Sequence, residues 1–224
     1  MLMPTPSSSS PPLSLHSELR RKAIHLLALI LPLGMVTLPP RWALLLLTIG
    51  ALLGVMGDVI RSRSASFARF IDYVFGALMR GEERQPVGHG VVLNGATWVL
   101  LSALLLLVVF PARIGALALT IFMIADAAAA LVGRRYGQTP WHISDRTLEG
   151  SAAFIVVGVC LVVALPTRSV AAGAIVVGVG ALMEAVPRPF NDNLRVPFVM
   201  AATLLVIEHI WFEEALTVFP YITG

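Results

Sequence analysis

Acidic and basic side chains recur near the ends of apolar segments in this chain, and their types suit phosphate chemistry. We interpret three carboxylates as both catalytic residues and metal ligands, namely those of Asp126, Glu149 and Asp192. Carboxylates hold Mg²⁺ through one or two direct bonds, while phosphate oxygens and water complete its coordination shell. The side chains expected to hold a nucleotide are those of Lys22, Arg134, Arg135, Arg146 and Asn193. Together these residues predict phosphoryl transfer, which depends mainly on positioning and on neutralising charge.

Three further residues are secondary candidates for this site, namely His25, Asn94 and Glu184. His25 lies one helical turn after Arg21, but a lone histidine near a membrane interface can equally be structural. Asn94 can equally supply a buried amide to helix packing. Glu184 precedes an Asn-Asp-Asn run that contains Asp192, and this run can also cap the helix that follows.

Asp126 is the strongest candidate because it lies inside an apolar segment. At 1.5 Å per residue, it lies roughly 10 Å before Gly133 at the end of that segment. An aspartate in the middle of a spanning helix costs about 2.5–3.5 kcal/mol on insertion. We therefore expect its carboxylate to face the protein interior, paired or bound to a metal. The alternative is a hydrogen bond to a neighbouring helix, for example to Asn94.

Three other features are open to two interpretations. Arg134 and Arg135 follow an apolar segment directly, so they are also ordinary signals of membrane topology. The sequence that begins at Glu149 suits either an anion-binding helix N-terminus or an acidic first turn favoured by the helix dipole. Asp58 and Arg61, at positions i and i+3, could form a simple surface pair.

The composition predicts a membrane protein. Hydrophobic residues make up 57% of the 224 residues, charged residues only 13%, and the mean hydropathy is +0.85. These values are typical of an integral membrane protein rather than a soluble domain. The net charge of +3 is too small to indicate a nucleic-acid partner. Cys160 is the single cysteine, which excludes an intrachain disulfide.

The expected fold is an all-α integral membrane protein, a single bundle of about seven transmembrane helices. A spanning helix needs roughly 20 residues, so the chain has room for seven spans with short loops. Residues 1–16, rich in Ser and Pro, are expected to be a disordered tail, and 17–224 to form the membrane domain. The apolar segments run 23–38, 42–60, 92–110, 114–133, 152–165, 170–186 and 196–212.

The distribution of arginine and lysine predicts the orientation. Of these 16 residues, 13 fall at one set of segment ends, and only Arg41, Arg113 and Arg168 fall at the other. By the positive-inside rule, the N-terminus is cytoplasmic, and the protein is multi-pass in the inner membrane if the source is prokaryotic. In the loop 61–90, apolar residues from Phe67 to Leu78 recur at steps of three and one. This spacing predicts an amphipathic helix, lying in the cytoplasmic interface or packed on the bundle.

The common nucleotide-binding motifs of soluble proteins are absent from the sequence. It contains no G-x-x-x-x-G-K-[ST] loop, no G-x-G-x-x-G turn and no protein-kinase signature. Any nucleotide site is therefore of another type.

Six blocks of the sequence resemble the CTP-dependent lipid-alcohol kinases, the family that includes dolichol kinase, phytol kinase and the fungal-type diacylglycerol kinase. The resemblance runs in order from about residue 18 to residue 197. The blocks are R-K-A-I-H (21–25), D-V-I-R (58–61), N-G-A-T (94–97), A-D-A-A-A-A-L-V-G-R-R-Y-G (125–137), T-L-E-G-S (147–151) and E-A-V-P with N-D-N (184–193). The short chain is similar to the compact, phytol-kinase-like members.

This resemblance implies that 17–224 is a transmembrane kinase domain. It implies transfer of the γ-phosphate of CTP to the hydroxyl of a membrane lipid alcohol at the cytoplasmic leaflet, with Mg²⁺ or another divalent metal. Phytol, polyprenol or dolichol, and diacylglycerol are the acceptors that the family suggests. The chain departs from the family at Arg146, where lysine is usual, so a point charge becomes a planar fork.

Two alternative functions remain at this point. A phosphatidate cytidylyltransferase also combines CTP, magnesium and a membrane bundle, but it releases pyrophosphate rather than CDP. A membrane transporter would also place acids inside helices, usually near the midplane and in repeated halves. The polar residues of this chain fall at one face instead, which favours the kinase.

Overall fold

The structure, a computed structural model, describes residues 23, 25–76, 87–88, 90–142, 144, 146–186 and 190–221. Within these ranges the protein is helical, and no strand is present beyond an isolated bridge between Pro140 and Thr147. The helices are α2 Ile30–Thr37, α3 Pro40–Arg63, α4 Ala65–Phe75, α5 Gly95–Val109, α6 Ala112–Tyr136, α7 Leu148–Ala164, α8 Val170–Ala185 and α9 Asp192–Phe212. The all-α prediction is confirmed for the described residues. The predicted tail 1–16 and Lys22 lie outside them.

Local sequence signals explain where these helices begin. The Asn94 side chain accepts hydrogen bonds from the amides of Ala96 and Thr97 and so caps α5. Thr147 caps α7 in the same way, and Asn191 caps α9. Such caps satisfy amides that have no partner within the first turn. Each of the seven apolar segments predicted from the sequence thus has a helix within it.

Three helices, α3, α6 and α9, are long and apolar enough to cross a membrane. Helices α5, α7 and α8 have 15 to 17 residues, so they extend about 22–26 Å, against about 30 Å of hydrocarbon. The first predicted segment, 23–38, is interrupted, and α2 begins only at Ile30. Pro32 explains this break, because it has no N–H to donate to the carbonyl of Ala28.

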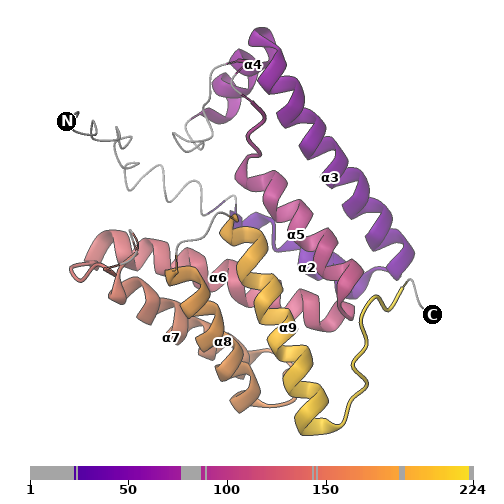
Figure 1. The fold of residues 1–224 in the computed structure, drawn as a ribbon, viewed down its shortest axis with the longest axis vertical. Helices are drawn as coiled ribbons and strands as arrows, with labels where there is room; N and C mark the ends of the chain where they lie inside the picture. Colours follow the sequence, from indigo (N-terminus) through magenta and orange to yellow (C-terminus); the bar gives the residue numbers. More distant parts are fainter. Residues whose placement is uncertain are drawn as a thin grey trace, which may run out of the picture.

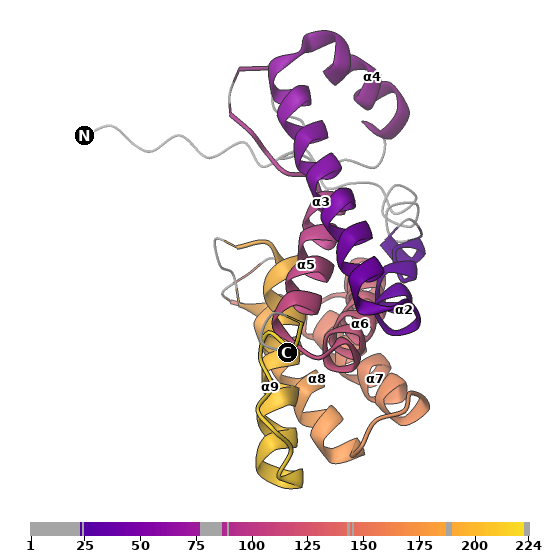
Figure 2. The same cartoon turned by 90° about the vertical axis from the view of Figure 1, so that its right-hand side faces the viewer.

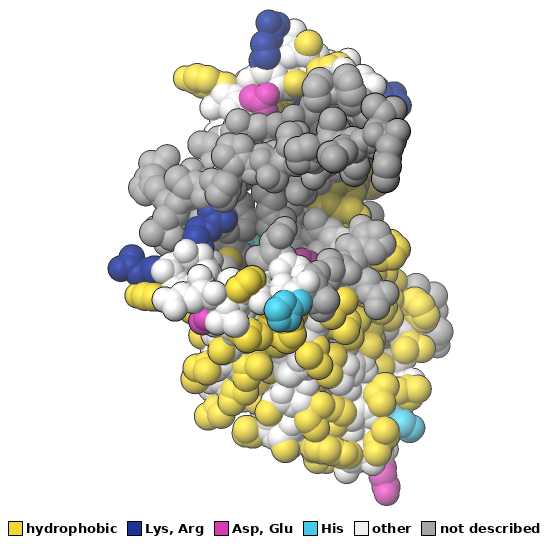
Figure 3. All heavy atoms as spheres, turned by 60° about the vertical axis from the view of Figure 1, so that its left-hand side comes forward, with side chains coloured by type: hydrophobic (Ala, Val, Ile, Leu, Met, Phe, Trp, Pro, Cys, Tyr) yellow, Lys and Arg dark blue, Asp and Glu magenta, His cyan; other side chains and the backbone are white. Residues whose placement is uncertain are grey.

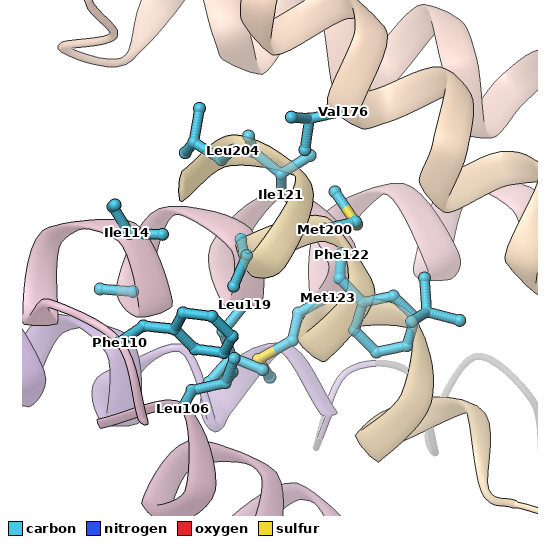
Figure 4. Close-up of a cluster of buried hydrophobic side chains, with 14 of the residues drawn as sticks. Leu106, Phe110, Ile114, Leu119, Ile121, Phe122, Met123, Val176, Met200 and Leu204 are labelled. Atoms are coloured by element: carbon cyan, nitrogen blue, oxygen red, sulfur yellow. The ribbon is translucent and has the colours of Figure 1, made fainter. Parts of the chain in front are cut away.

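Helix α6 lies in the middle of the described helices, in contact with α2, α5, α7 and α9 (Figure 1). Helices α3 and α5 pack together on one side of it, and α7, α8 and α9 form the other side. Figure 4 shows part of the core between them, to which α5 contributes Leu106, α6 contributes Phe122 and α9 contributes Met200. In a bilayer, van der Waals packing of such side chains holds helices together.

Helix α4 lies at the end of α3 that is remote from α7 and α8 (Figure 2). None of its residues is buried, and Phe70, Val74 and Phe75 are exposed. The predicted amphipathic helix is confirmed over Ala65–Phe75, while Leu78 lies outside the described residues. Figure 3 shows a second polarity pattern, with hydrophobic side chains over the lower part of the face and Lys and Arg only in the upper part.

Candidate functional site

An arginine between two carboxylates forms the centre of the candidate site. Nη1 of Arg146 lies 3.0 Å from Oε1 of Glu184, and its Nη2 lies 2.9 Å from Oδ2 of Asp192. Glu184 belongs to the last turn of α8 and Asp192 to the first turn of α9. A planar guanidinium can bind two acids at once in this way, which a lysine ammonium does less well. The end of α8 and the start of α9 are therefore joined through the side chain of Arg146.

The loop between α6 and α7 holds Arg146 in place through a short hairpin. The amide of Trp141 donates to the carbonyl of Arg146 at 2.8 Å, and the amide of Leu148 donates to the carbonyl of Thr139 at 2.9 Å. The indole N–H of Trp141 also donates to the Ser151 hydroxyl at 3.0 Å. These bonds fix the backbone from which the guanidinium extends.

The surroundings of Arg146 keep it charged. Burial of the guanidinium acts to lower its pKa, but the carboxylates of Glu184, Asp126 and Asp192 outweigh that effect. The net result is a pKa raised above the ordinary arginine value. A fixed positive charge thus stands among three acids from three different helices.

Asp126 faces this cluster from α6. Its residue is 6% exposed, and Oδ2 lies 3.9 Å from Nε2 of His25. The expected inward orientation of this carboxylate is therefore observed. The alternative partner, Asn94, donates from its amide nitrogen to Asp58 instead, at 2.8 Å.

Arg195 is a member of the cluster that the sequence did not indicate. Its Nη2 lies 2.7 Å from Oδ1 of Asp192 and donates to the carbonyls of Met183 and Val186 at 2.7 and 2.9 Å. Among the described residues, its Nε and Nη1 are buried and have no hydrogen-bond partner. Donor capacity for an anion is therefore left beside Asp192. The i, i+3 spacing from Asp192 was the one available signal.

Glu149 lies apart from these acids in its contacts. Its carboxylate oxygens accept a hydrogen bond from the backbone amide of Thr139, at 3.1 and 3.3 Å. Thr139 lies in the hairpin, just before the bridge residue Pro140. It belongs to the polar first turn of α7, ahead of the apolar segment that begins at residue 152. Hydrogen bonds from its own amide and from Thr139 hold the pKa of this carboxyl below its ordinary value. The residue braces the hairpin that carries Arg146.

The glycine after Glu149 serves helix packing. A Cβ built on Gly150 would lie 3.0 Å from the carbonyl oxygen of Ala129 and 3.5 Å from Cα of Gly133. Helices α6 and α7 therefore cross at close range, as small residues allow. The sequence left open whether this helix start binds an anion or is simply an acidic first turn. The group that approaches Gly150 closely in the structure is helix α6.

The remaining predicted nucleotide ligands are dispersed. Arg134 and Arg135 are exposed at the end of α6, where Nε of Arg135 donates to the hydroxyl of Tyr136 at 3.0 Å. Asn193 lies next to Asp192 at the start of α9 and borders a cavity. Lys22 lies outside the described residues. The roles assigned to these side chains stay predictions.

A second buried polar network lies between α3 and α5. Asp58 accepts hydrogen bonds from the amide and side-chain nitrogens of Asn94, at 3.0 and 2.8 Å, and from the Thr97 hydroxyl at 2.8 Å. Nε of Arg61 lies 4.0 Å from Oδ1 of Asp58, the oxygen that also accepts the side-chain nitrogen of Asn94. Asp58 is only 2% exposed, so the interpretation of Asp58 and Arg61 as a surface pair is wrong. The sequence could not show that α5 covers this face of α3.

The described acids allow only one type of magnesium site. No group of three or more His, Cys, Asp or Glu in the described ranges is arranged to hold a metal ion. Glu184 and Asp192 are bound to Arg146, and Glu149 is bound to Thr139. Both oxygens of Asp192 are paired with arginines, so Mg²⁺ binding here would rely on one or two carboxylates together with phosphate oxygens, and it stays a prediction.

The chain has limited similarity to known proteins. It is 29% identical over 139 residues to an uncharacterized protein of Rickettsia prowazekii (strain Madrid E). The aligned part covers 62% of this chain and 66% of that protein, just under two thirds of its length. The chain matches no family model and no solved structure.

Proposed function

We propose that this protein is a membrane phosphotransferase that transfers the γ-phosphate of CTP to the hydroxyl of a lipid alcohol. One observation carries the proposal, namely the convergence of Asp126, Glu184 and Asp192 on Arg146 from three helices and a loop. Carboxylates for a metal and guanidinium groups for phosphate are the two components that phosphoryl transfer needs. The resemblance of the six sequence blocks supplies the donor and the acceptor.

Each member of the cluster has a proposed role. Asp126 and Asp192 are the carboxylates that would hold Mg²⁺, which when bound neutralises phosphate charge. Arg146 and Arg195 would orient the phosphates, and this role is supported by the Nε and Nη1 donors of Arg195, which have no partner among the described residues. Glu149 positions the hairpin through Thr139, and it would serve in addition as a further metal ligand or as the base that orients the hydroxyl. Lys22, Arg134 and Arg135 would attract the nucleotide from the aqueous side.

The proposed membrane placement follows the charge distribution. We place the N-terminus and the charged cluster at the cytoplasmic leaflet, with seven helices crossing the bilayer and α4 lying in the interface. The arginines that end α3 and α6 support this orientation. The short helices α5, α7 and α8 would cross where the bilayer is locally thinned.

The test is a transfer assay in membranes that contain the purified protein. CTP or ATP labelled at the γ-phosphate is offered with phytol, a polyprenol or diacylglycerol. Labelled lipid phosphate together with CDP is the expected result. Release of pyrophosphate from CTP with phosphatidate would identify a cytidylyltransferase instead, and solute flux without nucleotide would identify a transporter.

A further inference from the structure

A cavity of about 540 Å³ lies between α2, α3 and α5. This volume is within the range of about 300–1,000 Å³ that is typical of small-molecule sites. The polar part of its lining consists of His25, Asp58, Arg61, Asn94 and Asn193. The apolar part includes Ile30, Leu31, Leu53, Val99 and Leu100.

The polar and apolar parts occupy different levels of the cavity. Helices α3 and α5 lie side by side (Figures 1 and 2), and the bond between Asp58 and Asn94 joins the end of one to the start of the other. On α3, Leu53 precedes Arg61 by about two turns. On α5, Val99 lies more than a turn after Asn94, so along α3 and α5 the polar groups share one level and the apolar groups share the next. Ile71 and Phe75 of α4 add further apolar lining on the side of that helix. Such a gradient suits an amphiphile with a small polar head.

The polar level of the cavity adjoins the charged cluster at two points. His25 lines the cavity, and its Nε2 lies 3.9 Å from Oδ2 of Asp126. Asn193 also lines the cavity, and the residue before it, Asp192, binds Arg146. A head group at this level would therefore lie next to the proposed phosphate site.

The apolar level is accessible from the outer surface of the helices. Ile30 of α2 is 69% exposed and Leu53 of α3 is 56% exposed, although both line the cavity. Exposed apolar side chains at the mouth of a cavity suit an apolar chain that continues into the acyl region of a bilayer. The cavity thus offers a lateral path for a chain longer than itself.

The charges around the cavity favour an uncharged head group. Asp58 and Arg61 lie 4.0 Å apart, so their opposite charges largely cancel. Beside His25 stands the carboxylate of Asp126, which would repel an anionic head. A hydroxyl, in contrast, can both donate and accept a hydrogen bond among His25, Asn94 and Asn193.

We infer that this cavity is the acceptor site, and that it binds an uncharged long-chain alcohol with its hydroxyl beside His25 and its chain leaving between α2 and α3. This inference rests on the proposed function for the fate of the hydroxyl. The binding site itself rests on the cavity lining and on its contact with the cluster.

A cavity-filling substitution tests the inference. A Cβ added at Gly57 of α3 meets no atom within 4 Å, and Gly57 lines the cavity. A larger side chain at this position therefore begins in open space beside the cavity lining. Gly178 of α8 is the matched control, because it is likewise half-buried, has equally open space at its Cβ and lies outside the cavity lining.

The probe is a phytol analogue that carries a photoreactive diazirine in its chain, used on the full-length protein in membranes without nucleotide. We expect labelling of peptides from α3 and α5. In Gly57→Leu we expect labelling to fall by about tenfold or more, and the KM for phytol to rise while the KM for CTP stays unchanged. Gly57→Ala should give an intermediate loss, and Gly178→Leu should behave like the wild type.

The outcomes separate the inference from the proposed function. Labelling of α3 and α5 that Gly57→Leu abolishes, in a protein that transfers no phosphate, supports the acceptor cavity and overturns the kinase. Transfer by Gly57→Leu and Gly57→Ala with a wild-type KM for phytol, or labelling only of other helices, overturns the cavity and leaves the kinase. Equal or better labelling by a diazirine analogue of phosphatidate overturns the assignment of an uncharged head.

Discussion

Two buried aspartates, Asp58 on α3 and Asp126 on α6, lie in similar helices but in different surroundings. Asp58 accepts three hydrogen bonds from the neutral donors of Asn94 and Thr97. Asp126 lies beside His25 and in the field of Arg146. Both carboxylates are almost inaccessible to solvent, so burial alone does not separate a structural acid from a candidate catalytic one. The partners do.

The two helices differ in how far the protein covers them. In the apolar 18-residue stretch of α3, 22% is buried inside the protein, against 72% in the corresponding stretch of α6. Helix α3 lies at the side of the bundle, so its acid needs a dedicated network from α5 to be satisfied. Helix α6 lies at the centre, where Arg146 of the hairpin and His25 both act on its acid. A site built from several elements is possible around Asp126 because α6 lies at the centre of the bundle, and not because of the acid itself.

The strongest test of the comparison is Asp126→Asn, which removes the negative charge at nearly constant volume. Losing one electrostatic group of this type lowers kcat by about 10²–10³-fold, or about 2.7–4 kcal/mol. We expect that loss in the labelled-CTP transfer assay, with an unchanged Tm in detergent. Wild-type turnover in this variant would remove Asp126 from the proposed chemistry.

The converse test is Asp58→Leu, which leaves the amide of Asn94 and the hydroxyl of Thr97 without an acceptor. An unsatisfied buried polar group costs about 1–3 kcal/mol. We expect a Tm lower by several degrees, measured by thermal unfolding of the purified protein. Thr97→Val is the matched control, since it removes one donor together with its bond and should cost less. An unchanged Tm for Asp58→Leu would mean that Asp58 is not a structural acid.

Arg146→Lys sharpens the comparison at the centre of the cluster. A lysine keeps the positive charge, but its ammonium cannot bind Glu184 and Asp192 with the same planar geometry. We expect kcat/KM for CTP to fall by about tenfold, or about 1.4 kcal/mol, with the fold retained. Arg41→Lys, at an exposed position near the start of α3 and at the other set of helix ends, is the control and should change little. Equal kinetics for Arg146→Lys and the wild type would show that charge alone matters.

The smallest expected effect concerns pH. The folded-state pKa of Arg146 is raised above that of an ordinary arginine, so its stabilising contribution is complete below the unfolded-state pKa and is lost only as pH rises through the folded-state pKa. The difference in Tm between the wild type and Arg146→Gln should therefore stay constant from about pH 6 to about pH 9. A difference that shrinks within this window would show that another group titrates with the cluster.

Much of the helical framework follows from local sequence. The segment predicted at 114–133 corresponds to α6, Ala112–Tyr136, because a long apolar run bounded by Pro111 and Gly137 has few other conformations available. The inward orientation of Asp126 also follows, since a lipid-facing acid is costly. Pro32 visibly interrupts the first apolar segment, but the sequence did not show that α2 begins only at Ile30.

The composition of the clusters depends on packing between distant segments. Arg195 could be placed next to Asp192 from sequence spacing, but its bonds to the carbonyls of Met183 and Val186 depend on how α8 meets α9. Glu149 had the expected residue type and the expected helix position, yet its carboxylate bonds Thr139 across the hairpin. Hydrogen-bond geometry of this kind is set within tenths of an ångström by packing.

The sequence by itself determined that the chain is apolar and helical, and that its acids and arginines collect at one set of helix ends. Short-range propensity and the energetic cost of polar groups in apolar surroundings are sufficient for that. Only the tertiary structure decided that Asp126, Glu184 and Asp192 share Arg146 while Asp58 serves α5, and that α2, α3 and α5 together line a cavity. These facts depend on contacts between residues far apart in the chain, and no local pattern encodes which helix covers which face.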